Sequence, residues 1–509
     1  VYDFRMDHDS LTDRIDTDTP ADSYALHKAL LVEPHEGGKR FEEGSWEHHL
    51  FLKWIEGGAR PRANDAADLV TLDVTPREIL VRAAGAEIQL RAVAVWSYGA
   101  REDVTCLCRF TRNDSAIAEI TSEGHITSGD VGDTHVVVSY DNAVVPIPII
   151  RPVTDRVGPK YPQLASRTPI DAAILEKLSK LGIIPSDICS DEEFIRRVSL
   201  DIAGTLPTAA EVRSFLADSS PDKRARKINE LLETPAYAAW WTTKFCDWTG
   251  CNDQTLNNVN PAAREAGSKD WYDWICRRVA NNVPYDDLVE GIVVAQSRLP
   301  GESYREYCER MSKFYSEEDK SFADQPGLMY FWGRNNFRTT EDRAIGFAYT
   351  FMGTRIQCAQ CHKHPFDVWT QDDFQQFEKF FARVNFARNG NDRGEYQKIL
   401  AEIGLDASKR VNGNDLRRAL DKAVREGKTI PFPEITITAS RSGRDRSRDG
   451  RNEPQMARLL GSSEVDLANI EDPRTALMDW LRNDPKQLFA KALVNRVWAN
   501  YFHRGIVEP

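Results

Sequence analysis

Two cysteines and a histidine form a short motif whose spacing is typical of one chemistry. The residues are Cys358-Ala359-Gln360-Cys361-His362, a CxxCH pattern. Because the sequence holds nine Cys and ten His among 509 residues, chance alone produces this pattern roughly 0.003 times in a chain of this composition. Two thiols three positions apart on one helical turn can each add across a vinyl group of one porphyrin, and the next histidine can bind its iron. The motif therefore predicts a c-type haem attachment site.

Two other kinds of site use the same pair of cysteines. A zinc site needs further ligands at similar spacing, and the sequence has no second CxxC, although His364 could supply a third or fourth ligand. A dithiol redox site normally follows a strand in a βαβ unit, whereas the surroundings of Cys358 show helical patterns. Zinc binding and dithiol chemistry stay open as alternatives to haem.

Helices are expected on both sides of the motif. Apolar residues recur at helical spacing over Ile345–Ile356, which predicts a helix leading into it. Thr370 and Asp373 suit the start of a second helix after it. One face of that helix carries Phe374, Phe377, Phe381 and Val384. We expect this face to pack over the haem or over a neighbouring helix bundle.

The motif falls in a long region, residues 166–388, that shows helix start signals throughout. Ser190 with Glu193, and Thr208 with Glu211, fit capping boxes. Pro221 and Pro235 each follow a Ser or Thr and are expected at first helical positions. An aromatic group behind these caps is expected to be core: Trp240, Trp241, Phe245 and Trp248. The region is predicted to be a helical, bundle-like domain.

Residues 67–150 change to a period of two, which predicts strands and an all-β sandwich. The strand-forming runs are Leu69–Val74, Ile88–Trp96 and His135–Tyr140. Pro146 and Pro148 are expected to interrupt the sandwich. Residues 151–165 read as a stiff linker because they contain three further prolines.

The two ends of the chain carry weaker signals. Within residues 1–66, Ser45 and Gly57 bracket a helix whose buried face is expected to hold Trp46, Leu50 and Trp54. Residues 389–470 are predicted to be a loop-rich connector, with Arg441–Arg451 as a solvated loop of mixed charge. Residues 471–509 begin a last helical region.

Composition excludes several functional classes. The chain carries 66 basic and 78 acidic residues, a formal charge of −12, so a nucleic acid is not the expected partner. There is no run of about 18 apolar residues that would predict a transmembrane segment, and no basic-then-apolar secretory leader at the start. We expect that the chain is cut at both ends. One or two disulfides are conceivable, with Cys246 and Cys251 closest in sequence, but their pairing cannot be read from sequence.

Several segments resemble the large planctomycete-type cytochrome c family. Phe194–Asp201, followed by Gly204–Thr208, resembles the opening of that family's central domain, and residues 358–374 resemble its most recognisable signature. Leu493–Trp498 is similar to the start of its C-terminal domain, and Tyr24–Ala59 to the tail of its N-terminal cytochrome domain. The Ig-like assignment depends on looser matches at residues 101–105 and 116–120.

The resemblance implies a multidomain, mainly α protein with a helical cytochrome-c-like central domain and an inserted all-β Ig-like sandwich. The expected segments are 1–66 (remnant of a cytochrome c-like domain), 67–150 (Ig-like), 151–165 (linker), 166–388 (helical, with the haem site), 389–470 (connector) and 471–509 (start of a C-terminal helical domain). It implies that Cys358 and Cys361 hold haem c covalently and that His362 is the proximal iron ligand. A further haem is expected in an N-terminal region that precedes this chain.

The distal ligand does not carry over from the family. His503 is a speculative candidate for the distal ligand. His364, two residues from His362, is interpreted either as a residue that supports the proximal ligand without binding the iron, or as an alternative iron ligand. Met329 and Met352 are weaker candidates because helical methionines are usually core. His35 could face a haem of the preceding region or lie in a turn.

The expected function is electron transfer by an exported protein, periplasmic or on the cell surface, with a redox partner protein of unknown identity. Association with the cell envelope follows from the Ig-like module, as a spacer or adhesion role. One alternative is a haem enzyme that acts on peroxide or another small molecule through an open iron position. The other is a cell-surface interaction protein with a structural metal, or no cofactor, at the CxxCH motif.

Overall fold

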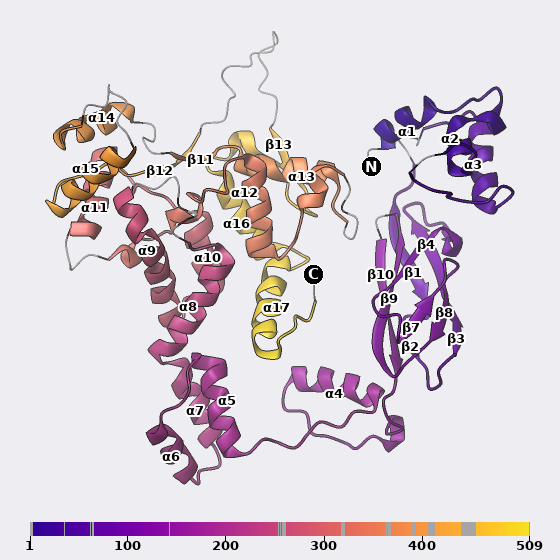
Figure 1. Ribbon diagram of the computed structural model, residues 1–509, viewed down its shortest axis with the longest axis horizontal. Coiled ribbons are helices and arrows are strands. Elements are labelled where there is room, and N and C mark those ends of the chain that lie inside the picture. Colours follow the sequence, from indigo (N-terminus) through magenta and orange to yellow (C-terminus); the bar gives the residue numbers. More distant parts are fainter. Residues whose placement is uncertain are drawn as a thin grey trace. The chain divides into compact units, whose positions relative to one another are not determined.

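The chain folds as a multidomain, mainly α protein (Figure 1). The computed structural model describes residues 4–34, 36–61, 63, 66–141, 143–252, 254, 256, 261–316, 321–362, 364, 368–387, 392–405, 413–438 and 455–507. Two compact units emerge: residues 1–188 with 361–371, and residues 189–360 with 372–509. His35 and Arg441–Arg451 lie outside the described residues.

The first unit begins with short helices, α1 (Phe4–Thr12), η1 (Pro20–Asp22), α2 (Tyr24–Ala29) and α3 (Trp46–Glu56). The predicted helix start is confirmed, because the Ser45 side chain accepts a hydrogen bond from the backbone of His48 at 3.3 Å. The predicted buried face is wrong at Trp46 and Leu50, whereas Trp54 is half-buried. Trp46 and Leu50 are 45% and 56% exposed, whereas Ile55 is fully buried. The inward face instead runs along residues 48, 51, 52 and 55, which also have helical spacing, so periodicity alone could not choose between the two faces.

Ten strands follow and enclose one apolar core. They are β1 (Leu69–Thr75), β2 (Ile79–Leu80), β3 (Glu87–Gln89), β4 (Arg91–Trp96), β5 (Arg101–Asp103), β6 (Arg109–Arg112), β7 (Ala118–Ile120), β8 (His125–Ser128), β9 (Gly132–Tyr140) and β10 (Ala143–Arg151), with the short turn η2 (Thr105–Leu107). The sheets have the strand orders β1-β4-β5, β2-β10-β9-β6 and β3-β8-β7. Buried residues of all three sheets, such as Val74, Ile126 and Val138, share the core.

Two details of the strand prediction are wrong. The run Ile88–Trp96 is two strands, because at the fully buried Leu90 the chain passes from the sheet of β3 to the sheet of β4. Pro146 and Pro148 lie within β10 rather than interrupting the fold. The two prolines are two residues apart, so their ring nitrogens lie on the same edge of β10, the edge that faces away from β9. Strand β2 pairs with β10 at Ile149 and Ile150, beyond both prolines, so neither proline has to donate a hydrogen bond to a neighbouring strand.

The segment after β10 is fastened to helix α4 (Pro169–Leu181). It contains a short turn, η3 (Gly158–Lys160), and the Val153 amide donates to the Leu181 carbonyl at 2.8 Å. Thr168 and Asp171 form a complete capping box at the start of α4. Lys180 of α4 pairs with Glu78 at 2.9 Å, so this helix groups with the strands in the first unit.

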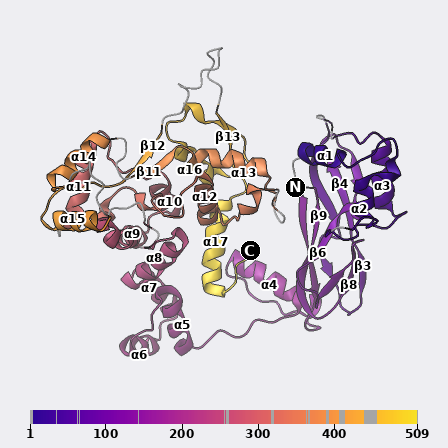
Figure 2. The ribbon, with the colours of Figure 1, turned by 45° about the horizontal axis from the view of Figure 1, so that its top comes forward.

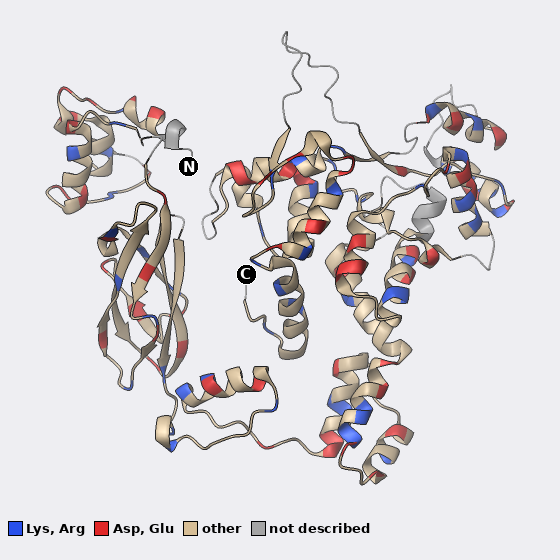
Figure 3. Ribbon diagram, turned by 180° about the vertical axis from the view of Figure 1, so that it is seen from behind, with Lys and Arg blue, Asp and Glu red and all other residues tan. Residues whose placement is uncertain are grey.

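The second unit is largely helical. Its elements up to the CxxCH motif are α5 (Asp191–Ala203), α6 (Ala209–Ala217), α7 (Lys223–Leu232), α8 (Pro235–Thr249), α9 (Pro261–Ala280), α10 (Tyr285–Val293), α11 (Tyr304–Ser316), η5 (Phe322–Asp324), η6 (Met329–Phe331), α12 (Thr340–Phe347), η7 (Ala348–Met352) and η8 (Gln357–Gln360). Helices α8 and α9 pack side by side (Figures 1 and 2). Along α5–α7 acidic and basic residues are interspersed (Figure 3), and they pair, as Lys223 and Arg224 do with Asp191 at 2.7 Å.

After the motif come α13 (Gln371–Glu378), η9 (Lys379–Phe381), β11 (Val384–Ala387), α14 (Arg393–Glu402), α15 (Gly413–Arg425), β12 (Glu434–Ile437), β13 (Met456–Arg458), β14 (Glu464–Asp466), η10 (Leu467–Asn469), α16 (Pro473–Asn483) and α17 (Leu488–Phe502). Two helices and three strands thus fall in the region predicted to be loop-rich. The last predicted helical stretch is two helices, because residues 484–487 leave the helix between α16 and α17.

The helix starts test the capping predictions directly. Thr208 forms both arms of the box with Glu211, and Pro235 occupies the first position of α8 after Thr234. At α5 only the Ser190 arm forms, because the Glu193 side chain pairs with Arg197 at 3.6 Å. Pro221 is not a first helical residue. Helix α7 begins at Lys223, since the preceding residues are held in a turn by the Asp218 side chain.

Candidate functional site

The helix that leads into the CxxCH motif changes its winding before it ends. Helix α12 starts at a complete capping box between Thr339 and Asp342. It then passes into a π-helix, η7, and stops at Gly353, whose φ is +63°. Phe347, Phe351 and Ile356 are buried, as the helical pattern predicted. π-Helical turns inside α-helices are frequent at functional sites, because they displace the residues that follow.

Helix α17 holds this π-helical segment from one side. Arg496 donates from Nη2 to the Tyr349 carbonyl at 2.7 Å and from Nη1 to the Thr350 carbonyl. A Cβ atom on Gly353 would lie 3.3 Å from the Cβ of Ala492. The close approach of α17 therefore depends on glycine at this position, which also has a left-handed backbone.

The motif itself forms a short turn that presents its chemical groups to solvent. Ala359 is 1% exposed, and its amide donates to the carbonyl of buried Ile356 at 3.0 Å. Cys358, Cys361 and His362 are exposed, and both thiols are free. Ala359 thus anchors the turn to the core while the three groups that could hold a haem remain accessible.

His364 belongs to the loop that follows the motif. Its side chain is half-buried, and its amide donates to the carbonyl of buried Trp369 at 2.8 Å. Residues 363 and 365–367 lie outside the described residues. His364 is thus close to the motif in sequence, and its backbone is hydrogen-bonded to that of Trp369. Helix α13 begins at Gln371, directly after Thr370, as predicted, and Phe374 and Phe377 are buried on it. The helix is shorter than predicted, because Phe381 lies in η9 and Val384 in β11, although both are buried.

The other predicted iron ligands lie elsewhere. His503 is exposed at the C-terminal end of α17, eleven residues after Ala492, which corresponds to about 16 Å along the helix axis. Met329 is 2% exposed, and its sulfur accepts from Ser297 and Tyr307, both at 3.3 Å. Met352 is 3% exposed. Both methionines are core residues, and the structure supplies no support for His503 beside the motif.

The zinc alternative gains no support either. Across the part of the chain that the structure describes, no three His, Cys, Asp or Glu residues gather in a way that could hold a metal ion.

None of the described helices combines the length and apolar character needed to cross a membrane.

Comparison with known proteins relates the motif region to one family. Residues 169–386 match a family model described as PSCyt2, protein of unknown function (DUF1549). This is a planctomycete cytochrome c-associated domain family. The match begins at the first residue of α4, includes the CxxCH motif and ends within β11. No curated protein matches the chain.

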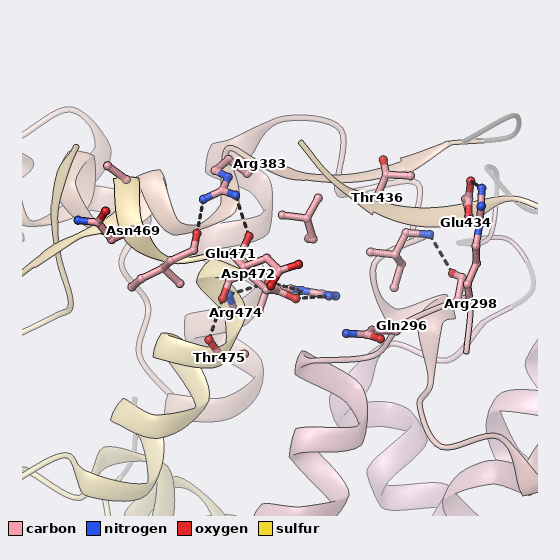
Figure 4. Close-up of a pocket in the computed structure, with 15 residues that line it drawn as sticks. Gln296, Arg298, Arg383, Glu434, Thr436, Asn469, Glu471, Asp472, Arg474 and Thr475 are labelled. Atoms are coloured by element: carbon pink, nitrogen blue, oxygen red, sulfur yellow. Dashed lines mark hydrogen bonds and ion pairs between the residues drawn. The ribbon is translucent and has the colours of Figure 1, made fainter. Parts of the chain in front are cut away.

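Apart from the CxxCH turn, the second unit contains a cavity of about 1030 Å³ lined by residues 296–298, 383, 434–437, 468–472, 474 and 475 (Figure 4). Arg298 binds Glu434 in two places, one at 2.7 Å, on one side of the cavity. Arg474 binds Asp472 at 2.6 Å on the other, and Arg383 donates to backbone carbonyls. All three arginines are used to hold segments together. Sequence reasoning missed this cavity because its walls come from four distant segments.

A buried acid forms a second polar cluster that the sequence did not reveal. Tyr315 donates to Oδ2 of Asp270 at 2.8 Å and contacts the Tyr330 hydroxyl at 2.9 Å. Burial raises the pKa of Asp270 to about 7, although the Tyr315 hydrogen bond opposes the shift. Burial also raises the pKa of both tyrosines well above the usual value. Asp270 can therefore hold a proton near neutral pH.

Proposed function

We propose that this chain is a c-type cytochrome that binds haem covalently and acts in electron transfer. In this proposal Cys358 and Cys361 form the two thioether bonds and His362 is the proximal iron ligand. The observation that carries the proposal is the solvent-facing CxxCH turn, in which both thiols are free and exposed.

The chemistry of these three residues fits haem c. Each thiol can add across one vinyl group of the same porphyrin, and an exposed histidine beside the second cysteine can bind the iron. When bound, the haem supplies a one-electron couple whose potential depends on the axial ligands and on the polarity around it. The chain's own contribution is to hold the thiols and the imidazole on one turn.

The support beneath the motif suits this role. Ala359 and Ile356 fix the turn to the core, and in the helix that precedes it the buried rings of Phe347 and Phe351 pack against each other with centroids 5.2 Å apart. Arg496 of α17 holds the carbonyls of the preceding π-helix. A base of this kind limits the movement of the motif, and a small reorganisation on oxidation or reduction favours electron transfer.

The family comparison supports the wider assignment. The PSCyt2 match covers the motif and the helices around it. By its resemblance to the planctomycete-type cytochrome c family, we propose that residues 67–150 are an Ig-like sandwich with a spacer or adhesion role. We also propose that residues 1–66 are the tail of a cytochrome c-like domain and that residues 471–509 begin a C-terminal helical domain.

Location and partners follow from the haem assignment. Covalent haem attachment takes place outside the cytoplasm, so we propose a periplasmic or cell-surface protein with possible envelope association. A single haem carries charge over a short distance, so the proposal includes a redox partner protein or further haems. His503 and His364 are the histidines to test as distal and supporting groups.

The full chain, expressed with an export signal and a c-type haem maturation system, tests the proposal. We expect a red protein whose intact mass exceeds that of the polypeptide by one haem and whose pyridine haemochrome spectrum is that of haem c. Cys358→Ala and Cys361→Ala should each leave one thioether, and the double variant should lose covalent haem. Cys106→Ser, which removes an exposed cysteine outside the motif, is the matched control and should load normally.

Spectra of the loaded protein separate the proposed function from its alternatives. A six-coordinate, low-spin iron supports electron transfer, whereas a five-coordinate, high-spin iron with peroxide turnover would favour an enzyme. A colourless protein with the bare polypeptide mass, or one that holds zinc in metal analysis, would overturn the proposal. His503→Ala and His364→Ala should shift the spectrum only if the substituted histidine binds the iron or supports a ligand.

A further inference from the structure

Helix α8 ends in a cap that brings two cysteines together. Gly250 adopts a left-handed conformation with φ +78°. The Gly250 amide donates to the Asp247 carbonyl at 3.3 Å, and the Cys251 amide donates to the Cys246 carbonyl at 2.9 Å. These two bonds define a Schellman motif, in which the side chains of the residues at the positions of Cys246 and Cys251 commonly contact each other.

Two other helix ends of this chain with the same backbone hydrogen bonds carry apolar residues at those positions. At the end of α4 the Ile183 amide donates to the Leu178 carbonyl at 3.0 Å, and at the end of α14 the Leu405 amide donates to the Leu400 carbonyl at 2.9 Å. Both caps place two apolar side chains where α8 has two thiols. The cap of α8 therefore replaces an apolar contact with a pair of sulfur atoms.

We propose that Cys246 and Cys251 are a redox pair that forms a disulfide across the C-terminal cap of α8. The backbone bond between the two residues keeps their Cα atoms close, as a disulfide requires. Both cysteines are free thiols, and the cap places them at the two positions whose side chains commonly contact each other. The proposal is independent of haem binding.

The two cysteines have different access to an oxidant. Cys251 is partly exposed, and its thiol donates to the Ser268 carbonyl at 3.4 Å, whereas Cys246 is 8% exposed. Cys251 is thus the thiol that meets a small-molecule disulfide first. Its thiolate attacks one sulfur of the oxidant, which forms a mixed disulfide and releases one thiol.

The Cys246 thiolate then attacks the Cys251 sulfur and releases the second thiol. Two protein thiols and one small disulfide give one protein disulfide and two small thiols, so the two protons and two electrons pass to the oxidant. A third cysteine, Cys276, lies on α9, the helix that packs against α8. The cap geometry favours Cys251 over Cys276 as the partner of Cys246.

The bond would fasten a junction inside the second unit. Thr249 lies between the two cysteines in the sequence. Arg334 Nη1 donates to the Thr249 carbonyl at 3.0 Å, and Trp271 Nε1 donates to the Thr249 hydroxyl at 3.2 Å. Helix α9 and the segment that contains Arg334 both meet α8 at this point. Oxidation would therefore stabilise the place where three segments join.

Peptide mapping after equilibration with oxidised and reduced glutathione tests the proposal. Trypsin leaves Cys246 and Cys251 in one peptide, residues 245–264, and Cys276 in another, residues 270–277. We expect the first peptide to be lighter by two hydrogen atoms and not linked to the second. In Cys276→Ser the bridged fraction should stay the same, and in Cys251→Ser it should disappear.

Comparing folded and denatured protein separates cap geometry from simple proximity in sequence. We expect the equilibrium constant for the bridge to be at least about tenfold larger in the folded chain. Equal constants, a cross-link between the two peptides, a persistent glutathione adduct on Cys251, or complete alkylation of both thiols after oxidation would each overturn the proposal. None of these readings depends on haem, so a failure here is distinct from a failure of the cytochrome assignment.

Discussion

The buried acid of α9 makes the stability of the second unit depend on pH in an unusual direction. Asp270 has a pKa near 7 in the folded chain against an ordinary value of 3.8. The folded state therefore holds a proton that the unfolded state has released between these two values. The favourable contribution is complete below about pH 3.8 and is lost as the pH rises through 7.

Replacing the acid by its neutral isostere should remove this dependence. A shift of about three pKa units corresponds to about 4 kcal/mol. Because the side chain retains some solvent exposure, which screens the charge, we expect Asp270→Asn to raise the free energy of unfolding by about 2–4 kcal/mol at pH 8. The difference should vanish near pH 4, where wild-type Asp270 is neutral in the folded state.

Urea unfolding between pH 4 and 8, followed by tryptophan fluorescence, measures this effect. Trp271 and Trp274 follow Asp270 within one turn of the same helix and are fully buried, so they report on its local environment. Asp273→Asn on α9 is the matched control, because its carboxylate is about one-third exposed and pairs with Lys269. A difference between Asp270→Asn and wild type that does not change with pH, or that grows toward acid, would refute the reasoning.

Three further substitutions test contacts described above. Arg474→Ala should lower the free energy of unfolding by about 3–5 kcal/mol in urea denaturation, because it leaves Asp472 largely buried without its partner; Arg474→Lys should recover part of the loss. Gly353→Ala should lower the melting temperature more than Gly301→Ala. Both glycines have positive φ, but only the first approaches α17, so equal shifts would contradict the role given to that contact. Thr208→Ala should cost about 1 kcal/mol through loss of the α6 cap, and no change in the denaturation midpoint would argue against the capping box.

The sequence predicted best what depends on neighbouring residues. The caps at Thr208 and Thr234 follow from side chains within three residues of each helix start, and they form as expected. The CxxCH motif is likewise local, because its three chemical groups lie within five consecutive residues. Near Ser220 the sequence contains two competing local signals. The turn formed by the Asp218 side chain prevails over Pro221, so α7 starts at Lys223 instead of at the proline.

What the sequence could not predict depends on distant segments. The face that α3 buries, around Ile55 rather than Trp46, depends on what packs against it. The prolines of β10 are tolerated because of where β2 pairs. Tyr315 donates a hydrogen bond to Asp270, 45 residues away in the sequence, and no local pattern predicts this contact.

The π-helical turn before the motif has a consequence for how length changes are tolerated. Five residues, 348–352, carry this wider winding. Removing one of them would let α12 continue as an ordinary helix, and each residue of such a helix turns the chain by about 100°. The cysteines would then leave the helix in a different direction, although every one of their side chains was kept. Insertions and deletions upstream of the motif should therefore be more harmful than substitutions there.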